Sequence, residues 1–345
     1  MRTVEIHRRV TVFGLGGTIA MTAVATGGVA PALTADQLVA DVPGLAETGI
    51  DVAVVNFRQV PGASLKISDV TALAEAIRDG LAEADGAVVT QGTNTIEETA
   101  YLLDLLHTGP QPIVVTGAMR NPTLAGADGP ANLLAAIQTA ADPDSREQGC
   151  LVVFNDEIHA ARRVRKTHTT STATFQSQNG GPLGYVVEGQ PRLLSRLTHR
   201  TTIPAKPVDG IRIPILTATL GDDGATLRAI ADHIDGLILA GAGPGHVPAE
   251  LVPALEALAA KVPVILASRT GAGSVLRSTY GFPGSERDLL ARGLICAGYL
   301  DPVKARILLY MLLSSGGDKT TLEAAFAAAG GYRSAETWPW PSDSN

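Results

Sequence analysis

A threonine follows a run of glycines near the start of the chain, in Phe13-Gly-Leu-Gly-Gly-Thr-Ile-Ala20. The apolar stretch before it, Val10–Leu15, predicts a buried strand, so Thr18 is expected just beyond a strand end. Glycines allow a sharp turn and a close approach of the backbone to a ligand. A dinucleotide-binding G-x-G-x-x-G turn needs glycine where Ile19 stands, which disfavours that interpretation. The segment therefore predicts an accessible hydroxyl group at a binding turn.

A second polar turn, Thr90-Gln-Gly-Thr-Asn-Thr-Ile-Glu-Glu98, joins another predicted strand to a helix. Thr95 is the predicted N-cap, and its spacing from Glu98 fits a capping box. Thr93 and Asn94 then precede the helix N-terminus, where unpaired N–H groups and the helix dipole favour a carboxylate or an oxyanion. A capped turn without chemistry is the simpler alternative, and a second polar turn on the same sheet weighs against it.

A third segment, Ala161-Arg-Arg-Val-Arg-Lys-Thr-His-Thr-Thr170, is basic and then rich in hydroxyl groups. A solvated loop is the ordinary interpretation of such a run. If the segment folds back under the sheet, burial lowers the pKa of its lysine, Lys166, which can then serve as a base.

Short β-branched runs alternate with helical patterns in the first half of the chain. Strands are expected at Val10–Leu15, Val52–Phe57, Ala87–Thr90, Ile113–Thr116 and Leu151–Phe154, and helices at Asp69–Ala84, Ile96–His107 and Pro130–Ala141. This alternation predicts an α/β fold, a parallel sheet with helices on both faces. Ligands bind such sheets beyond the carboxyl ends of the strands, where Thr18 and Thr93 are expected.

The pattern changes over Gly189–Gly210, which has three prolines and few apolar residues. Strands are expected again at Ile211–Leu216, Gly236–Ala240 and Val262–Ala267, and helices at Ala225–His233, Pro248–Ala260, Ser285–Arg292 and Pro302–Ser314. The 345 residues are enough for two hydrophobic cores. We therefore expect a larger N-terminal domain over residues 1–190, a linker over residues 191–210 and a smaller α/β domain over residues 211–345.

Composition and charge exclude several classes of protein. Lys and Arg number 27 against 34 Asp and Glu, a net charge of −7 without a basic stripe, which disfavours nucleic-acid binding. No apolar run approaches the ~20 residues of a membrane span, and the start lacks a signal-peptide core. Cys150 and Cys296 lie in apolar segments and predict buried thiols in a reducing compartment. We expect a soluble cytoplasmic protein with no nucleic-acid or membrane partner.

Eight short motifs follow one another from about residue 10 to residue 325. They are Gly16-Gly-Thr-Ile-Ala20, Gly92-Thr-Asn-Thr-Ile-Glu-Glu-Thr-Ala-Tyr101, Thr116-Gly-Ala-Met-Arg120, Ala127-Asp-Gly-Pro130, Lys166-Thr-His-Thr-Thr170, Ala173-Thr-Phe175, Gly181-Pro-Leu-Gly184 and Asp301-Pro-Val-Lys-Ala-Arg306. Together they resemble the bacterial-type L-asparaginase/glutaminase family. The resemblance implies a flavodoxin-like N-terminal domain, a smaller α/β C-terminal domain, and a homotetramer built as a dimer of dimers, or a homodimer.

The resemblance also implies catalytic roles. Thr18 matches the nucleophilic threonine that forms an acyl-enzyme, Thr93 the second essential threonine, and Lys166 the lysine that pairs with it in a base relay. A threonine hydroxyl needs such a base because it is a weak nucleophile at neutral pH. Backbone N–H groups of the two glycine-rich turns, Gly92 included, are candidates for the oxyanion site. No metal and no organic cofactor is implied, and the histidines show no ligand spacing.

The residues that would contact the substrate depart from the family pattern. Asn94 stands where the family usually has the aspartate that holds the substrate's α-ammonium, so a negative charge is lost. The segment for the substrate carboxylate offers Gly62, Ala63 and Ser64. His246 falls where an asparagine of a neighbouring subunit usually reaches the site, as a ligand contact or an interface residue.

The glycine- and alanine-rich loop Met21–Pro31 fits a mobile lid but lacks the family's lid tyrosine. Thr22, Thr26 and Tyr280 are the hydroxyl groups that could replace it. We therefore expect an amidohydrolase for the side-chain amide of L-asparagine or a related small amide. The alternatives are a hydrolase of another amide, lactam or ester that lacks a free α-ammonium, and a catalytically weak small-molecule binder on the same fold.

Overall fold

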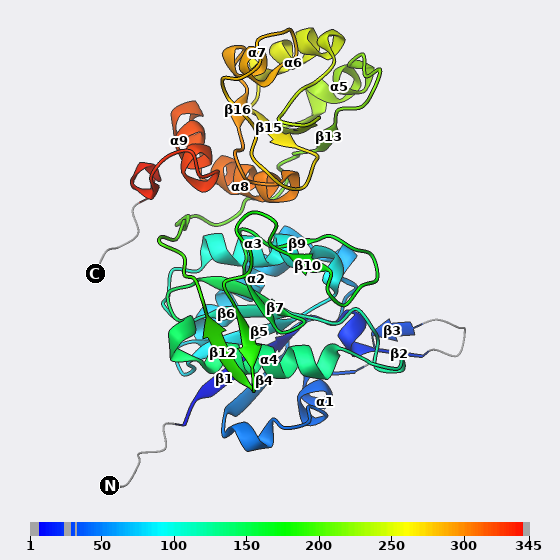
Figure 1. Ribbon diagram of the computed structural model, residues 1–345, viewed down its shortest axis with the longest axis vertical. Helices are drawn as coiled ribbons and strands as arrows, with labels where there is room; N and C mark the ends of the chain where they lie inside the picture. Colours follow the sequence, from blue (N-terminus) through cyan, green and yellow to red (C-terminus); the bar gives the residue numbers. More distant parts are fainter. Residues whose placement is uncertain (1–6, 24–28, 32, 341–345) are drawn as a thin grey trace. The chain divides into compact units, whose positions relative to one another are not determined.

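The computed structural model describes residues 7–23, 29–31 and 33–340, and within them the chain forms two units, residues 1–200 and 201–345. The first unit contains a sheet with the strand order β12-β11-β8-β7-β6-β5-β1-β4 (Figure 1). The division between the units falls within the stretch predicted as a linker, although the first residues of that stretch belong to strand β12 (Gln190–Leu193).

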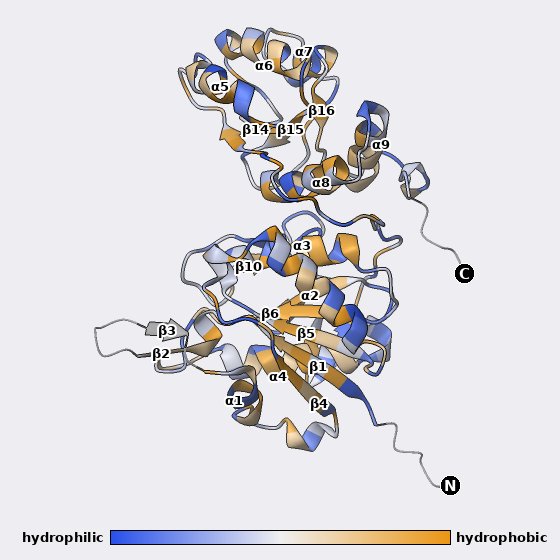
Figure 2. Ribbon diagram, turned by 180° about the vertical axis from the view of Figure 1, so that it is seen from behind, coloured by the Kyte–Doolittle hydropathy of each residue, from blue (hydrophilic) through white to orange (hydrophobic). Residues whose placement is uncertain are grey.

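Five strands of this sheet are parallel: β1 (Arg9–Gly14), β4 (Asp51–Asn56), β5 (Gly86–Thr90), β6 (Ile113–Thr116) and β7 (Cys150–Phe154). Strands β5, β6 and β7 are buried along their whole length because helices cover both faces of the sheet, and Figure 2 shows β5 and β6 in the colour of hydrophobic residues. Counted along the chain, the five strands lie in the order 2-1-3-4-5, which is the flavodoxin-like order. The predicted α/β fold class is confirmed.

The helices of the first unit are α1 (Ala35–Ala40), α2 (Ile67–Gly80), α3 (Ile96–Leu106) and α4 (Gly129–Ala141). Leu133 and Ile137 of α4 pack on the face of the sheet that carries Val88 and Val114. Helices α2 and α3 cover the opposite face (Figure 1). A capping box formed by Thr34 and Gln37 starts α1.

The antiparallel part of the sheet is absent from the sequence prediction. Strands β8 (Glu157–Ala160), β11 (Gly184–Val187) and β12 are each antiparallel to their neighbours. A two-residue turn, Asn155–Asp156, joins β7 to β8, and both of its residues have positive φ, as tight hairpins require. Strand β12 contains Pro191, which an edge strand tolerates because no partner needs its N–H group.

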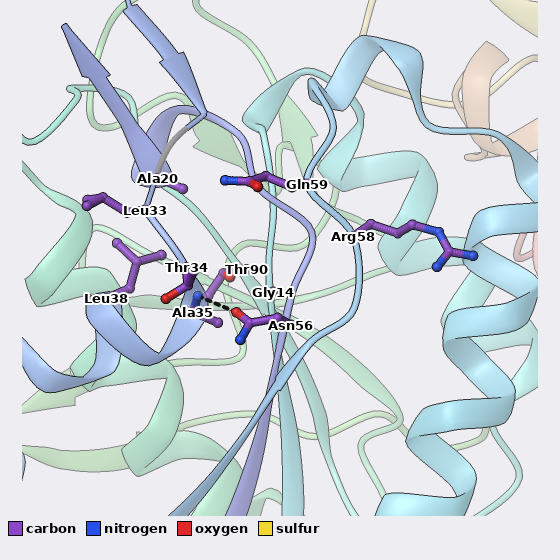
Figure 3. A pocket seen from close by; sticks show the side chains of 11 residues that line it. Gly14, Ala20, Leu33, Thr34, Ala35, Leu38, Asn56, Arg58, Gln59 and Thr90 are labelled. Carbon is purple, nitrogen blue, oxygen red and sulfur yellow. Dashed lines mark hydrogen bonds between the residues drawn. The ribbon is translucent and has the colours of Figure 1, made fainter.

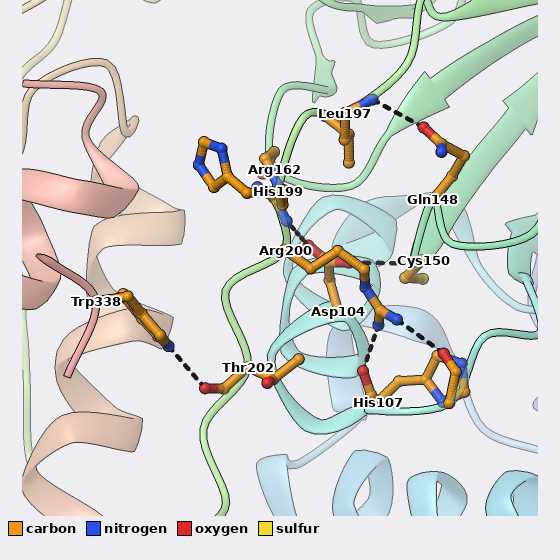
Figure 4. A network of polar contacts seen from close by, with 11 residues as sticks. Asp104, His107, Gln148, Cys150, Arg162, Leu197, His199, Arg200, Thr202 and Trp338 are labelled. Carbon is orange, nitrogen blue, oxygen red and sulfur yellow. Dashed lines mark hydrogen bonds and ion pairs between the residues drawn. The ribbon is translucent and has the colours of Figure 1, made fainter. Parts of the chain in front are cut away.

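A buried polar network fastens the end of the first unit to its helices (Figure 4). The Arg162 guanidinium donates to Asp104 Oδ2 at 3.2 Å and to the His199 carbonyl at 3.0 Å. Asp104 Oδ1 also accepts the N–H of Cys150, whose thiol is free and buried, as the sequence predicted. Arg200 donates to the carbonyls of His107 and Gly109. These hydrogen bonds tie His199 and Arg200 to helix α3 and to the residues that follow it.

The second unit contains four parallel strands in the order β13-β14-β15-β16. They are β13 (Ile215–Thr217), β14 (Leu237–Gly241), β15 (Val264–Ser268) and β16 (Ile295–Cys296). Its helices are α5 (Ala225–Ile230), α6 (Val252–Ala259), α7 (Glu286–Ala291), α8 (Pro302–Ser314) and α9 (Lys319–Ala329). Strand β13 starts later than predicted, just after Pro214, whose nitrogen carries no hydrogen to donate.

A buried histidine makes the stability of the first unit sensitive to acid. His159 on β8 is inaccessible to solvent, and its Nδ1 lies 3.0 Å from Ser177 Oγ. Its Nε2 lies 3.1 Å from Glu157 Oε2, at an angle too poor for a hydrogen bond. Burial lowers the pKa of His159 from 6.5 to about 4. Between these values the unfolded chain binds a proton that the folded chain does not, so stability is complete above pH 6.5 and falls toward pH 4.

Through His159, the free energy of unfolding is expected to fall by about 3 kcal/mol between pH 6.5 and pH 4. Replacing His159 with glutamine is expected to abolish this fall. Urea unfolding of both proteins across this pH range measures the difference. Parallel stability curves for the wild type and the variant would contradict the assignment.

Candidate active site

Three turns meet where β1 and β5 lie side by side, at the point in the strand order where ligands usually bind. At Gly17 an added Cβ atom would lie 2.1 Å from Gly92 N, so the turn after β1 touches the turn after β5 through backbone alone. At Gly62 an added Cβ atom would lie 2.7 Å from the Gly92 carbonyl oxygen. The contact brings the turn of Thr18 against the turn of Thr93, as well as the segment Gly62–Ser64.

Thr18 begins a short 3₁₀ turn, η1 (Thr18–Ala20), directly after two glycines with φ of +88° and +89°. The Leu15 N–H donates to the Thr90 carbonyl at 2.9 Å, which ties the exit of β1 to the end of β5. Ile19 and Ala20 are buried and anchor the turn, whereas Thr18 is partly exposed. The hydroxyl-bearing residue is therefore the accessible one in the turn.

Gly17→Ala is expected to destabilise the protein by more than about 3 kcal/mol, because a Cβ atom overlaps the Gly92 backbone in addition to the strain of positive φ. Gly49→Ala is the matched control. Gly49 has φ of +67° and no atom within 4 Å of the added Cβ, so it gives the cost of an ordinary left-handed backbone without a clash, about 1 kcal/mol. Chemical unfolding compares the two, and equal losses would show that the turns are not in contact.

Lys166 reaches the second threonine across 73 residues of chain. It lies in the two-residue strand β9 (Arg165–Lys166), which pairs with β10 (Phe175–Gln176). Its Nζ donates to Thr93 Oγ1 at 2.7 Å and lies 3.5 Å from Asn94 Oδ1. Burial lowers the pKa of Lys166, and the Glu97 carboxylate acts in the opposite direction. The lysine predicted as a base thus donates a hydrogen bond to the threonine it was predicted to serve.

The predicted capping box at Thr95 is wrong, because the Thr95 side chain caps no helix N–H. A 3₁₀ turn, η4 (Thr93–Thr95), precedes α3, and Thr95 Oγ1 instead donates to the Gly62 carbonyl at 2.9 Å. This bond links the turn after β5 to the 3₁₀ turn η3 (Gly62–Ser64), in which Gly62 is buried and Ala63 and Ser64 are exposed. Thr95 therefore helps to hold the turns of the site together.

Two further residues shape the site, and sequence reasoning gave them no role. Gln91 is fully buried, and its amide lies within hydrogen-bond distance of the Gly92 carbonyl and of Thr95 Oγ1. Asp128 accepts the N–H groups of Met119 and Arg120 and thereby holds the turn after β6. For Asp128, the sequence does contain a signal: the residue stands directly before a Gly-Pro pair at the start of a helix. Gln91 has none, since its partners are set by the fold.

A pocket of about 200 Å³ opens beside these turns (Figure 3). The hydroxyl of Thr90 is buried in its wall, with no hydrogen-bond partner among the described residues. Asn56 is held by the Ala35 N–H at 2.7 Å, and the Arg58 guanidinium points away from the other lining side chains. The lining residues are Gly14, Gly16, Ala20, Leu33, Thr34, Ala35, Leu38, Asn56, Arg58, Gln59 and Thr90.

His246 lies in the second unit, on the glycine-rich turn after β14. Its Nε2 is 3.0 Å from Glu286 Oε2, a buried carboxylate that also accepts the N–H groups of Thr279 and Tyr280. The rings of Tyr280 and Phe282 contact the imidazole edge to face, at centroid distances of 4.8 and 5.0 Å. Tyr280, one of the candidates to replace the lid tyrosine, thus packs on His246.

Other predictions for the lid fall largely outside the described residues. The ends of the loop pair as β2 (Met21–Ala23) and β3 (Val29–Pro31). Thr26 lies outside the described residues, as does the side chain of Thr22. In the part of the chain that the structure covers, no three His, Cys, Asp or Glu side chains group as metal ligands, and no helix is long and apolar enough to cross a membrane.

Comparison with known proteins agrees with this arrangement. Residues 9–199 match the family model described as "Asparaginase, N-terminal", and residues 212–326 match the "Glutaminase/Asparaginase C-terminal domain" model. The chain belongs to the asparaginase family. The predicted resemblance is therefore confirmed, and family membership makes the protein an amidohydrolase that acts on an amide C–N bond.

Similar proteins match over most of their length. The L-asparaginase of Bacillus licheniformis is 33% identical over 90% of this chain and 97% of its own. A probable L-asparaginase of Deinococcus radiodurans is 34% identical over 92% of this chain and 97% of its own. Among solved structures, a probable cytoplasmic L-asparaginase from Campylobacter jejuni superposes with a TM-score of 0.82, at 30% identity over 92% of this chain and 99% of that one.

Proposed function

We propose that this member of the asparaginase family hydrolyses the side-chain amide of L-asparagine to aspartate and ammonia through an acyl-threonine intermediate. The main support is the 2.7 Å hydrogen bond between Lys166 and Thr93. Thr93 lies on a turn that contacts the turn of Thr18. The names of the similar proteins support the substrate.

The proposed reaction has two steps. In the first, Thr18 Oγ attacks the amide carbon, the C–N bond breaks, and the hydroxyl proton leaves on the nitrogen as ammonia. In the second, water attacks the resulting ester and releases aspartate and the Thr18 hydroxyl. The Thr93–Lys166 pair is the proposed relay that accepts and returns protons, which the lowered pKa of Lys166 favours. Backbone N–H groups of the glycine-rich turns, including that of Gly92, are the proposed oxyanion site.

The remaining candidates for substrate contacts are Asn94, Gly62, Ala63, Ser64 and His246. Asn94 is exposed beside Lys166 and supplies an amide where a carboxylate would attract an α-ammonium group. This observation favours a second candidate function, hydrolysis of a small amide, lactam or ester without a free α-ammonium. A weak binder on the same fold would show no turnover that depends on Thr18.

Ammonia release from L-asparagine, D-asparagine, L-glutamine and N-acetyl-L-asparagine tests the substrate, and the ring opening of a lactam is followed by the amino group that it exposes. L-Asparagine is expected to turn over most rapidly. If only the blocked or cyclic amides turn over, the second candidate function, hydrolysis of an amide without a free α-ammonium, replaces L-asparagine hydrolysis.

Asn94→Asp is expected to raise kcat/KM for L-asparagine by about 10-fold or more, because a charged acceptor holds an ammonium more strongly than a neutral one. N-Acetyl-L-asparagine has no ammonium and is the matched control, for which no gain is expected. An equal gain with both substrates would mean that residue 94 acts on the relay rather than on the ammonium.

For assembly we propose a homotetramer built as a dimer of dimers, with a homodimer as the smaller alternative, and sedimentation equilibrium distinguishes them. For location we propose the cytoplasm. The free, buried thiols of Cys150 and Cys296 suit a reducing compartment, and the similar Campylobacter protein is named as cytoplasmic.

A further inference from the structure

The hairpin that carries Lys166 is small. Its strands, β9 and β10, pair over two residues each and form a sheet of their own, so the ladder alone gives the hairpin little rigidity. Lys166 pairs with Phe175, and Ser177 follows Phe175 by two residues. Directly opposite residues of an antiparallel pair share a face, as do residues two apart along a strand. The side chains of Lys166, Phe175 and Ser177 therefore project from the same side of the hairpin.

Two of these side chains fasten the hairpin to the large sheet. The Phe175 ring lies against Phe154, the last residue of β7, with ring centroids 4.8 Å apart. Ser177 Oγ lies 3.0 Å from Nδ1 of His159, in β8. An apolar contact has no preferred direction, whereas a hydrogen bond is restricted in both distance and angle. The Ser177–His159 bond is therefore the contact that can set the position of the hairpin.

The bond between Ser177 and His159 is well protected from water. His159 is inaccessible to solvent, and only 6% of Ser177 is exposed. Separating two buried polar groups is costly because neither finds another partner readily. His159 itself is held in the large sheet, where it pairs with Val152 of β7. Ser177 is thus attached to a rigid part of the first unit.

We propose that Ser177 and His159 are positioning residues for the proposed reaction. Their hydrogen bond fixes the β9–β10 hairpin, so that the Lys166 amine meets the Thr93 hydroxyl. The relay depends on this placement, since a displacement of about 1 Å can lower a catalytic rate ~100-fold. The catalytic consequence of this inference rests on the proposed function, but its consequence for the rigidity of the hairpin does not.

The test compares Ser177→Ala with Ser145→Ala in the full-length protein. Ser145 is also buried, in the turn between α4 and β7, and its hydroxyl donates to Asp142 Oδ2 at 3.3 Å. The control therefore loses a buried serine hydroxyl bond outside the hairpin. Hydrogen exchange with mass spectrometry follows the amides of residues 165–177, and kcat and KM are measured with L-asparagine.

Ser177→Ala is expected to speed the exchange of residues 165–177 about fivefold, because the hairpin opens more often. Its kcat is expected to fall about tenfold while KM changes less than about threefold, since the proposed substrate contacts lie on other turns. Ser145→Ala should change neither. If Ser177→Ala does not fold, Ser177→Cys carries the same expectation, because its thiol has a similar shape and is a weak donor.

A Lys166→Met background shows whether Ser177 acts through the lysine. In that background Ser177→Ala should change kcat less than about twofold, because no amine is left to position. A further loss of about tenfold there would overturn the proposal, as would unchanged exchange or unchanged kcat in Ser177→Ala alone. If the wild type releases no ammonia from any amide, the proposed function fails, and the exchange experiment still decides whether the Ser177–His159 bond fixes the hairpin.

Discussion

Replacing Thr18 with alanine is expected to lower kcat for L-asparagine at least about 10³-fold, because the acyl-enzyme cannot form without its hydroxyl. The change removes few atoms from a partly exposed position between anchored neighbours, so the fold and the binding of the product L-aspartate should persist. Ammonia release measures the first effect and calorimetric titration with L-aspartate the second.

Thr18→Ser is the matched control for this experiment. It keeps the hydroxyl group and loses a methyl group, and it should retain measurable turnover. If Thr18→Ala kept more than a tenth of the wild-type kcat, another group would have to be the nucleophile.

Breaking the Thr93–Lys166 pair is expected to have the second largest effect. Lys166→Met or Thr93→Val should lower kcat by about 10²- to 10⁴-fold, the range in which a positioned base contributes to catalysis. Because the two side chains act as one relay, the double variant should be little slower than either single variant.

Lys166→Arg separates the role of the charge from that of the proton. An arginine keeps the positive charge but does not deprotonate near neutral pH, so it should stay as inactive as Lys166→Met. Recovery of turnover in Lys166→Arg would mean that the lysine acts only as a cation. Additive losses in the double variant would mean that Thr93 and Lys166 act independently.

Much of the fold could be predicted because its parallel strands are local, apolar signals. Strands β5 and β6 are short runs rich in β-branched residues that are buried on both faces, and each is followed by a helical pattern. The antiparallel strands β8, β11 and β12 carry weaker signals. They are four residues each, and β12 contains Pro191 at the sheet edge. Their pairing depends on a hairpin turn with positive φ at Asn155 and Asp156 that hydrophobic periodicity does not reveal.

The site residues also divide into those that a local sequence pattern predicts and those that it does not. Glycine-rich turns after predicted strands identified Thr18 and Thr93, because flavodoxin-like sheets bind ligands at that edge. The Lys166–Thr93 bond joins residues 73 apart through a two-residue strand, so it was available only from the family resemblance. Thr95 is the N-cap residue of α3, as predicted, yet tertiary structure directs its hydroxyl to the Gly62 carbonyl instead of to a helix N–H group. A residue such as Gln91 acquires its role only from what the fold places beside it.

In the proposed mechanism, amide hydrolysis proceeds through an ester on Thr18. Rapid acid quenching of the wild-type enzyme during turnover of L-asparagine, followed by peptide mapping with mass spectrometry, tests it most directly. We expect the mass of one aspartyl group on the peptide that contains Thr18, and none in Thr18→Ala. The same mass on the Thr93 peptide, or steady turnover with no adduct on either threonine across the quench times, would contradict the account.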